Sequence, residues 1–128
     1  MKYVLHAVFF LLGMAAAVAA PAGAAKAGSA RAGKAIFAHT CANCHSTRIG
    51  VNEVGPSLLG VVGRAPASVP GFVYSDAMKA NATPWTPEAL DAYLANPRGH
   101  RPGVKMWFKG LSSAKARSDV IAYLKTLK

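Results

Sequence analysis

The chain has 128 residues and a formal net charge of +10 at pH 7. This length allows one domain, and two cysteines are too few for a disulfide-stabilised scaffold. The excess of basic residues predicts attraction to acidic surfaces and says nothing about the fold.

The N-terminus has the pattern of an export signal. Met1 and Lys2 supply a positive start, an apolar run covers residues 3–20, and small residues follow as far as residue 27. This pattern predicts a secretory signal peptide over residues 1–24, with cleavage between 20 and 27, and therefore a periplasmic protein. The alternative is an uncleaved membrane anchor, because the apolar run is close to the ~18 residues that can span a bilayer. Residues 25–128 would form the single domain.

Local signals predict three main helices. The first covers residues 29–38, the second starts with a Thr-Pro-Glu cap at 86–88 and ends at Asn96-Pro97, and the third covers 113–127 with an apolar stripe at helical spacing. A short extra turn is predicted at Ser75. No stretch alternates as a strand should, so the predicted fold is all-α with long loops. Long loops in so small a domain favour a large apolar group, such as haem, in the centre.

Both cysteines lie in the pentapeptide Cys41-Ala42-Asn43-Cys44-His45. C-x-x-C-H is the attachment signature of c-type haem. The two thiols can add to the two porphyrin vinyl groups, and the adjacent imidazole then lies under the iron as its proximal ligand. Two other interpretations fit less well. A thioredoxin-like pair should lie near a βαβ pattern, and a zinc site needs a second pair of ligands.

The second axial ligand has two candidates beyond this motif, Met78 and Met106. Haem electron carriers often place Met opposite His, which raises the reduction potential. We predict Met106, because it follows a rigid Pro-Gly turn at 102–103 that can hold a side chain over the ring. Met78 is more typical of a residue that fills space in a core. The alternative interpretation of Met106 is also that it fills space in the core, next to Trp107 and Phe108.

Further short motifs accompany these residues in a fixed order, and they include Gly33-Lys34-Ala35-Ile36-Phe37, Gly55-Pro56-Ser57-Leu58-Leu59-Gly60, Pro70-Gly71-Phe72-Val73-Tyr74-Ser75, Tyr93-Leu94-Ala95-Asn96-Pro97 and Pro102-Gly103-Val104-Lys105-Met106. In this order and spacing the chain resembles the class I cytochromes c, especially the mitochondrial and alpha-proteobacterial type. The resemblance covers nearly all of residues 33–128. It implies the class I cytochrome c fold, with three main helices and long loops around one covalent haem c.

The resemblance also implies roles for individual residues. His45 and Met106 would ligate the iron, and the carbonyl of Pro56 would accept a hydrogen bond from the His45 ring. The residues implied around the haem propionates are Arg64, Tyr74 and Trp85.

Other implied contacts lie further from the iron. Tyr93 would reach toward the Met106 sulfur, and Gly33 and Phe37 would pack where the first and last helices cross, against Tyr123 and Leu124. Two positions depart from the family pattern. Val104 replaces a Thr that usually bonds a propionate, and Met78 replaces a polar residue near the haem interior.

These patterns predict a periplasmic carrier of single electrons and not an enzyme, because fixed His/Met ligation leaves no open position on the iron. The alternative is a haem c subunit of a periplasmic dehydrogenase or oxidase. A peroxidase or gas sensor would need an open distal site, and a nucleic-acid partner does not suit an exported protein.

The expected partners are the acidic faces of redox proteins, such as an oxidase, a reductase or a dehydrogenase. Basic residues surround the segments that carry the predicted ligands, with Glu53 as the main exception: Lys34, Arg48, Arg98, Arg101, Lys105 and Lys109. We predict a positive ring around the haem edge of a monomeric protein, which steers it onto acidic partners.

Overall fold

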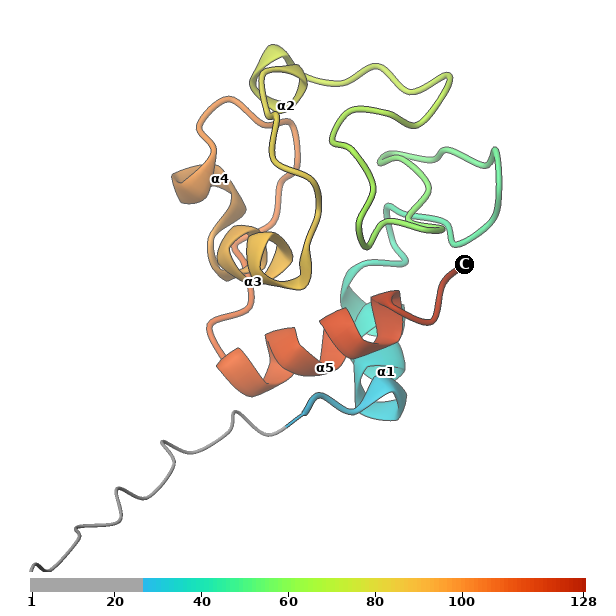
Figure 1. Ribbon diagram of the computed structural model, residues 1–128, viewed down its shortest axis with the longest axis vertical. Coiled ribbons are helices and arrows are strands. Elements are labelled where there is room, and N and C mark those ends of the chain that lie inside the picture. The colour runs from blue at the N-terminus through green and yellow to red at the C-terminus, as the bar shows by residue number, and fades with distance from the viewer. Residues whose placement is uncertain (1–26) are drawn as a thin grey trace, which may run out of the picture.

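The computed structural model describes residues 27–128, which form five helices joined by long loops and no strand (Figure 1). The helices are α1 (Ala30–Thr40), α2 (Asp76–Lys79), α3 (Pro87–Ala95), α4 (Pro97–His100) and α5 (Ala114–Leu124). This confirms the all-α prediction. The predicted signal peptide lies outside the described residues. Within them, no helix has the length and apolar character needed to cross a membrane.

The three main helices begin where their capping side chains predict. The hydroxyls of Ser29, Thr86 and Ser113 accept hydrogen bonds from the backbone N–H groups of Ala32, Ala89 and Ala116. Each bond satisfies a backbone donor that has no partner inside the helix. The short turn predicted at Ser75 is the N-cap of α2.

Helix ends differ from the sequence prediction at three places. Helix α1 continues to Thr40, two residues further than expected, and α5 ends at Leu124 and not at Leu127. Helix α4 was not predicted, because Asn96-Pro97 was interpreted only as the end of α3. The Asn96 side chain also caps a new helix, since its Oδ1 accepts the N–H of Gly99 at 3.0 Å and Pro97 occupies the first helical position.

Helices α1 and α5 cross at the lower end of the molecule in Figure 1. Gly33 makes this close approach possible, because a Cβ atom at this position would lie 1.9 Å from the backbone oxygen of Asp119. The Phe37 and Tyr123 rings pack edge to face next to it, with centroids 5.2 Å apart. The expected contact of Phe37 with Tyr123 is therefore present, whereas Gly33 faces α5 one turn earlier than expected.

Asp119 adds a polar contact at the same crossing. Its carboxylate accepts the backbone N–H of Ser29 at 2.7 Å and forms an ion pair with Lys115. These two partners hold the pKa of Asp119 below its ordinary value, Lys115 having the larger effect. The contact fixes the N-cap residue of α1 to α5, the last helix of the chain.

The buried core connects this crossing to the loops above it. Its hydrophobic members come from α1, α3, α5 and three loop segments: Phe37, Val61, Trp85, Leu90, Tyr93, Val104, Val120, Ile121 and Leu124. Arg117 of α5 ties α3 to this core by an ion pair with Asp91 at 2.7 Å. Among the residues described, α1 and α5 therefore form a base, and α3, the short helices α2 and α4, and the long loops lie above it (Figure 1).

We predict that Gly33→Ala lowers the free energy of unfolding by about 2 kcal/mol, because the added methyl group overlaps the α5 backbone and the helices must separate. Denaturant titration of the haem-loaded protein measures this change. Lys34→Ala, one residue along α1 on its exposed side, serves as the control and should change stability by less than about 0.5 kcal/mol. A Gly33→Ala variant as stable as the parent would contradict the prediction. Ala has a higher helix propensity than Gly, so only the overlap with the α5 backbone predicts a loss of stability.

Candidate haem site

The two cysteines lie at the end of α1. The backbone N–H of Cys41 donates to the Phe37 carbonyl at 2.8 Å, and the N–H groups of Cys44 and His45 both donate to the Cys41 carbonyl at 3.0 Å. This tight turn holds both thiols, which are free and half-buried, beside the His45 ring. Burial, assisted by the neighbouring Cys44, raises the pKa of Cys41 to about 11. A redox-active thiol pair of the thioredoxin type needs a lowered pKa, so this thiol has the opposite character.

The His45 imidazole is held from two sides. Its Nδ1 lies 2.7 Å from the Pro56 carbonyl oxygen, so that nitrogen carries the proton and Nε2 presents a lone pair. Gly55 also lies against the ring, because a Cβ atom there would come within 2.3 Å of the His45 Cε1. Burial lowers the pKa of His45, which favours the neutral imidazole that binds metals.

Sequence reasoning assigned the hydrogen bond to Pro56 but gave Gly55 no role. The signal was present in the chain as a Gly-Pro pair after the motif. The sequence does not show how closely the Gly55 segment approaches the C-x-x-C-H motif. The Gly55 backbone N–H donates to the Cys44 carbonyl at 2.7 Å, and this approach leaves no room for a side chain at position 55.

Arg64 is a half-buried cation that bonds only to neutral groups. Its guanidinium donates to the carbonyls of Leu59 at 2.7 Å and Ser57 at 3.0 Å, and none of the ion pairs among residues 27–128 includes it. Burial lowers the pKa of this group, so an anion nearby would stabilise its charge. Backbone hydrogen bonds join the Arg64 segment to Trp85, from Trp85 N–H to the Arg64 carbonyl at 3.0 Å and from Gly63 N–H to the Trp85 carbonyl at 2.8 Å.

The predicted aromatic residues fall into two pairs. Tyr74 packs edge to face on Phe72 with centroids 4.8 Å apart, and its hydroxyl oxygen accepts the backbone N–H of Val69. Trp85 and Tyr93 lie side by side in the core with centroids 5.0 Å apart. The structure thus brings Arg64 and Trp85 together and joins Trp85 to Tyr93.

Tyr93 stays protonated over the whole physiological range, because burial raises its pKa to about 12. In the described part of the chain its hydroxyl makes no hydrogen bond to Met106. A residue that sequence reasoning placed only in the basic ring lies nearby: Arg101, whose positive charge acts on the Tyr93 phenol. The Nε of Arg101 is buried without a hydrogen-bond partner within residues 27–128.

Met106 is half-buried and packs against the core in a loop whose two ends are fixed. At one end, the Lys105 ammonium donates to the Val73 carbonyl at 3.2 Å. At the other, the Leu111 N–H donates to the Leu94 carbonyl at 2.8 Å, and Gly110 adopts a φ of 102° against the α3 backbone. Met78 of α2 packs against the same core, so burial alone does not separate the two candidate ligands.

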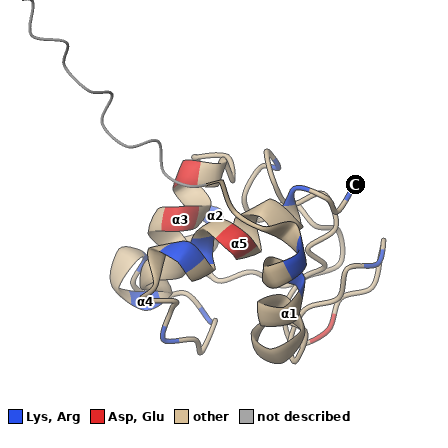
Figure 2. Ribbon diagram, turned by 90° about the horizontal axis from the view of Figure 1, so that it is seen from below, with Lys and Arg blue, Asp and Glu red and all other residues tan. Residues whose placement is uncertain are grey.

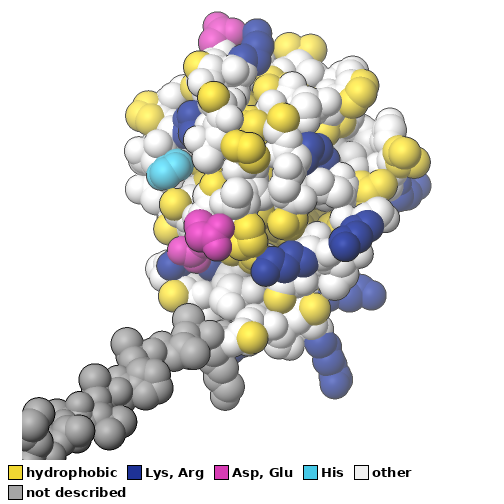
Figure 3. Space-filling view, viewed as in Figure 1, with side chains coloured by type: hydrophobic (Ala, Val, Ile, Leu, Met, Phe, Trp, Pro, Cys, Tyr) yellow, Lys and Arg dark blue, Asp and Glu magenta, His cyan; other side chains and the backbone are white. Residues whose placement is uncertain are grey.

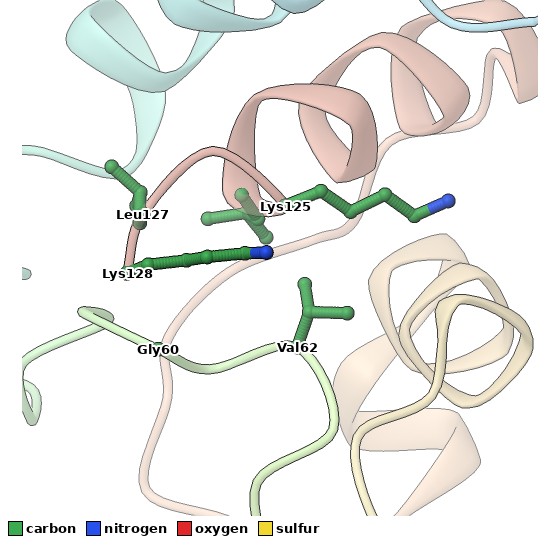
Figure 4. Close-up of a pocket in the computed structure, with 6 residues that line it drawn as sticks. Gly60, Val62, Lys125, Leu127 and Lys128 are labelled. Atoms are coloured by element: carbon green, nitrogen blue, oxygen red, sulfur yellow. The ribbon is translucent and has the colours of Figure 1, made fainter.

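The surface hollow shown in Figure 4 is a different feature. It has a volume of about 350 Å³, and its lining comes from the C-terminal end of α5 and the loop opposite: Gly60, Val62, Leu124, Lys125, Leu127 and Lys128. None of the predicted site residues lines it. The described residues also contain no group of three or more His, Cys, Asp or Glu side chains placed to hold a metal ion.

Comparison with known proteins matches residues 30–128 to the cytochrome c family. The chain belongs to the cytochrome c family. It is 48% identical to the cytochrome c of Euglena viridis over 95 residues, which covers 74% of this chain and 93% of that protein. It is 55% identical over 91 residues to a protein of Rhodobacter capsulatus named cytochrome c-type cyt cy, and this match covers 71% of the chain and 45% of the relative.

A solved structure supports the same assignment. Cytochrome cH from Methylobacterium extorquens superposes with a TM-score of 0.72 at 43% identity, covering 77% of this chain and 99% of that one. The class I cytochrome c fold is thereby confirmed. As a member of this family the chain is an electron carrier and not an enzyme, and it binds one covalent haem c with its iron.

The residues present fit such a cofactor. Two free thiols lie in the same five-residue segment as an imidazole whose Nε2 is unprotonated, and Gly55 leaves no room for a side chain against that ring. The half-buried Arg64 would complement an anionic group such as a propionate. Figure 3 shows hydrophobic side chains in the middle of the face that it draws, with Lys and Arg side chains beside them. An apolar surface with a few cationic neighbours suits a porphyrin that carries carboxylates.

We predict that Gly55→Ala disturbs the position of His45, because the new methyl group overlaps the imidazole. The haem-loaded variant should lose about 2 kcal/mol of unfolding free energy, and the haem methyl resonances of the oxidised protein should shift in its NMR spectrum. Val54→Ala is the matched control, since the Val54 side chain is exposed. Unchanged haem methyl shifts in Gly55→Ala would show that the close contact does not orient the ring.

Proposed function

We propose that this chain is a periplasmic electron shuttle that holds its haem c through Cys41 and Cys44, with His45 and Met106 as the axial ligands. The observation that carries the proposal is the His45 geometry. The ring proton is fixed on Nδ1 by the Pro56 carbonyl at 2.7 Å, so Nε2 is available as a ligand next to the two free thiols.

The bound haem supplies one-electron chemistry at its iron, and the chain's residues determine how that chemistry is used. Cys41 and Cys44 hold the cofactor covalently. The thioether of Met106 favours ferrous iron and raises the reduction potential. With His45 and Met106 both bound to it, the iron would have no free position for a substrate, which suits a carrier.

A second group of residues would surround the periphery of the haem. Arg64, Tyr74 and Trp85 are proposed to meet the propionates, in support of which Arg64 is half-buried with no anionic partner among the described residues. The Tyr93 phenol is proposed to approach the Met106 sulfur. Its raised pKa suits this role, because a protonated phenol remains a hydrogen-bond donor.

The ligand assignment predicts different results for the two methionines. Met106→Ala should open the distal position, lower the reduction potential and allow carbon monoxide to bind the reduced protein, because the thioether ligand is lost. Met78→Ala, which also removes a half-buried methionine packed against the core, is the matched control and should cost stability without admitting the ligand. Carbon monoxide difference spectra and redox titration measure both effects. If Met78→Ala opened the site and Met106→Ala did not, the assignment would be reversed.

The export signal predicts the form in which the protein is isolated. The periplasmic fraction of the source cells should contain the chain with its new N-terminus created by cleavage between residues 20 and 27, as a monomer carrying one haem. Intact-protein mass and size-exclusion chromatography measure these properties. A full-length chain in the membrane fraction would show that the N-terminal segment is an anchor. Stable co-purification with a dehydrogenase or oxidase would favour the subunit function.

A further inference from the structure

Arg101 carries a side-chain nitrogen that is buried without a hydrogen-bond partner. Its Nε is the only side-chain nitrogen or oxygen in this condition among residues 27–128. None of the ion pairs in this part of the chain includes Arg101. Burying a polar group of a charged side chain without a partner lowers the stability of a protein, so such a feature needs a physical reason.

The backbone holds Arg101 between α4 and the loop that carries Met106. Arg101 is the C-cap of α4, and its backbone N–H donates to the Pro97 carbonyl at 2.9 Å. Its own backbone is extended, with φ −141°, as the following Pro102 favours. The Pro-Gly turn at 102–103 then leads to the proposed ligand, so the half-buried Arg101 side chain begins from a fixed position five residues before Met106.

The other half-buried arginines of the described chain have oxygen partners. The Arg117 guanidinium donates to the Asp91 carboxylate and to two backbone carbonyls. The Arg64 guanidinium donates to the carbonyls of Leu59 and Ser57. Both groups therefore have a structural role that explains their burial. Arg101 has no such bond among residues 27–128, so cross-linking of loops does not account for its charge.

The charge of Arg101 acts on the interior of the protein. It reaches the buried Tyr93 phenol, whose ring packs on Trp85 with centroids 5.0 Å apart. The sequence contains no Asp or Glu between residues 92 and 118. Figure 2 shows Lys and Arg positions around α4 and acidic positions on α3 and α5. The segment that carries Arg101 therefore supplies no carboxylate to cancel its charge.

We propose that Arg101 is a residue that tunes the redox centre: its unpaired, half-buried charge raises the reduction potential of the haem iron ligated by Met106. This inference rests on the proposed His45 and Met106 ligation. Reduction adds one electron to the centre, and a fixed cation nearby stabilises the additional negative charge. A guanidinium stays charged at every working pH, so this contribution does not depend on pH.

The tuning role predicts that stability and potential respond differently to the loss of Arg101. Replacement of a buried, unpaired charged group by an apolar side chain of similar volume is often neutral or stabilising. Arg101→Leu should therefore leave the free energy of unfolding of the oxidised protein unchanged or higher, while the reduction potential falls. A residue needed only to hold the Met106 loop would instead cost stability when it is replaced.

The test is redox titration of the haem-loaded protein at low and at high ionic strength. We expect Arg101→Leu to lower the equilibrium constant for reduction about tenfold, which corresponds to a potential about 59 mV lower. The shift should persist at high ionic strength, because salt screens a partly buried charge weakly. Arg101→Lys retains the charge and should recover most of the potential.

Arg98→Leu is the matched control, because it removes an exposed positive charge one turn earlier in the chain. It should change the equilibrium constant less than twofold at high ionic strength. The absorption band of thioether-ligated ferric haem should be present in every variant, which shows that Met106 has not left the iron.

Three results would overturn the tuning role: a change of less than twofold in Arg101→Leu, a shift that disappears with salt as that of Arg98→Leu does, or a potential in Arg101→Lys as low as in Arg101→Leu. Loss of the thioether band in Arg101→Leu would assign Arg101 a structural role in the loop instead. Absence of that band from the parent protein would count against the Met106 ligation itself, and this outcome is separate from the other results.

Discussion

The proposed function of this protein depends on how His45 is fixed. The ring is bounded by the Pro56 carbonyl, 2.7 Å from Nδ1, and by the backbone of Gly55, which leaves no room for a side chain. The Gly55 N–H closes the same loop by donating to the Cys44 carbonyl. As the proposed ligand, His45 has to present Nε2 in one tautomer, and the hydrogen bond to the Pro56 carbonyl favours the tautomer protonated on Nδ1.

That loop depends in turn on the crossing of α1 and α5. The motif begins at the C-cap of α1, where the Cys41 N–H bonds to the Phe37 carbonyl, and the Phe37 side chain packs on Tyr123 of α5. The orientation of α1 therefore sets the direction in which the thiols and the imidazole point. Gly33 determines how closely the two helices approach. A substitution at this helix crossing therefore changes the position of the C-x-x-C-H motif through α1.

Local signals in the sequence were sufficient to predict those features that depend only on residues adjacent in the sequence. Ser29, Thr86 and Ser113 begin helices because each side chain bonds to a backbone N–H three residues later. The C-x-x-C-H motif indicates the cofactor for the same reason, since its chemistry needs only five consecutive residues. Asn96 was interpreted incompletely because one residue can end a helix and cap the next, and the sequence pattern is the same for both cases.

Features that depend on contacts between distant segments could not be predicted in this way. Gly55 has a role only because the loop after the motif returns to the His45 ring. Similarly, the stacking of Arg98 on Trp107 joins α4 to a loop whose path no local pattern specifies. The resemblance to cytochromes c supplied positions for the expected ligands, but a resemblance gives no information about residues that are particular to this chain.

The arrangement of the acidic residues explains how so basic a protein keeps its charge available to partners. The chain has 15 Lys and Arg residues against 5 Asp and Glu, and three of those acids form ion pairs within residues 27–128: Asp76 with Lys79, Asp91 with Arg117, and Asp119 with Lys115. Two of these pairs involve α5, at the base of the molecule, where they join or cap helices.

Asp91 and Asp119 therefore neutralise bases that serve the scaffold, whereas Asp76 of α2 interacts with Lys79 and also with the charge of Lys105 beside Met106. A uniform distribution of the same charges would give the same net charge but a weaker local potential at the docking surface, because screening limits each charge to a range of about 8–10 Å. For the proposed carrier, an uneven distribution of the two signs would orient the protein as it approaches a partner.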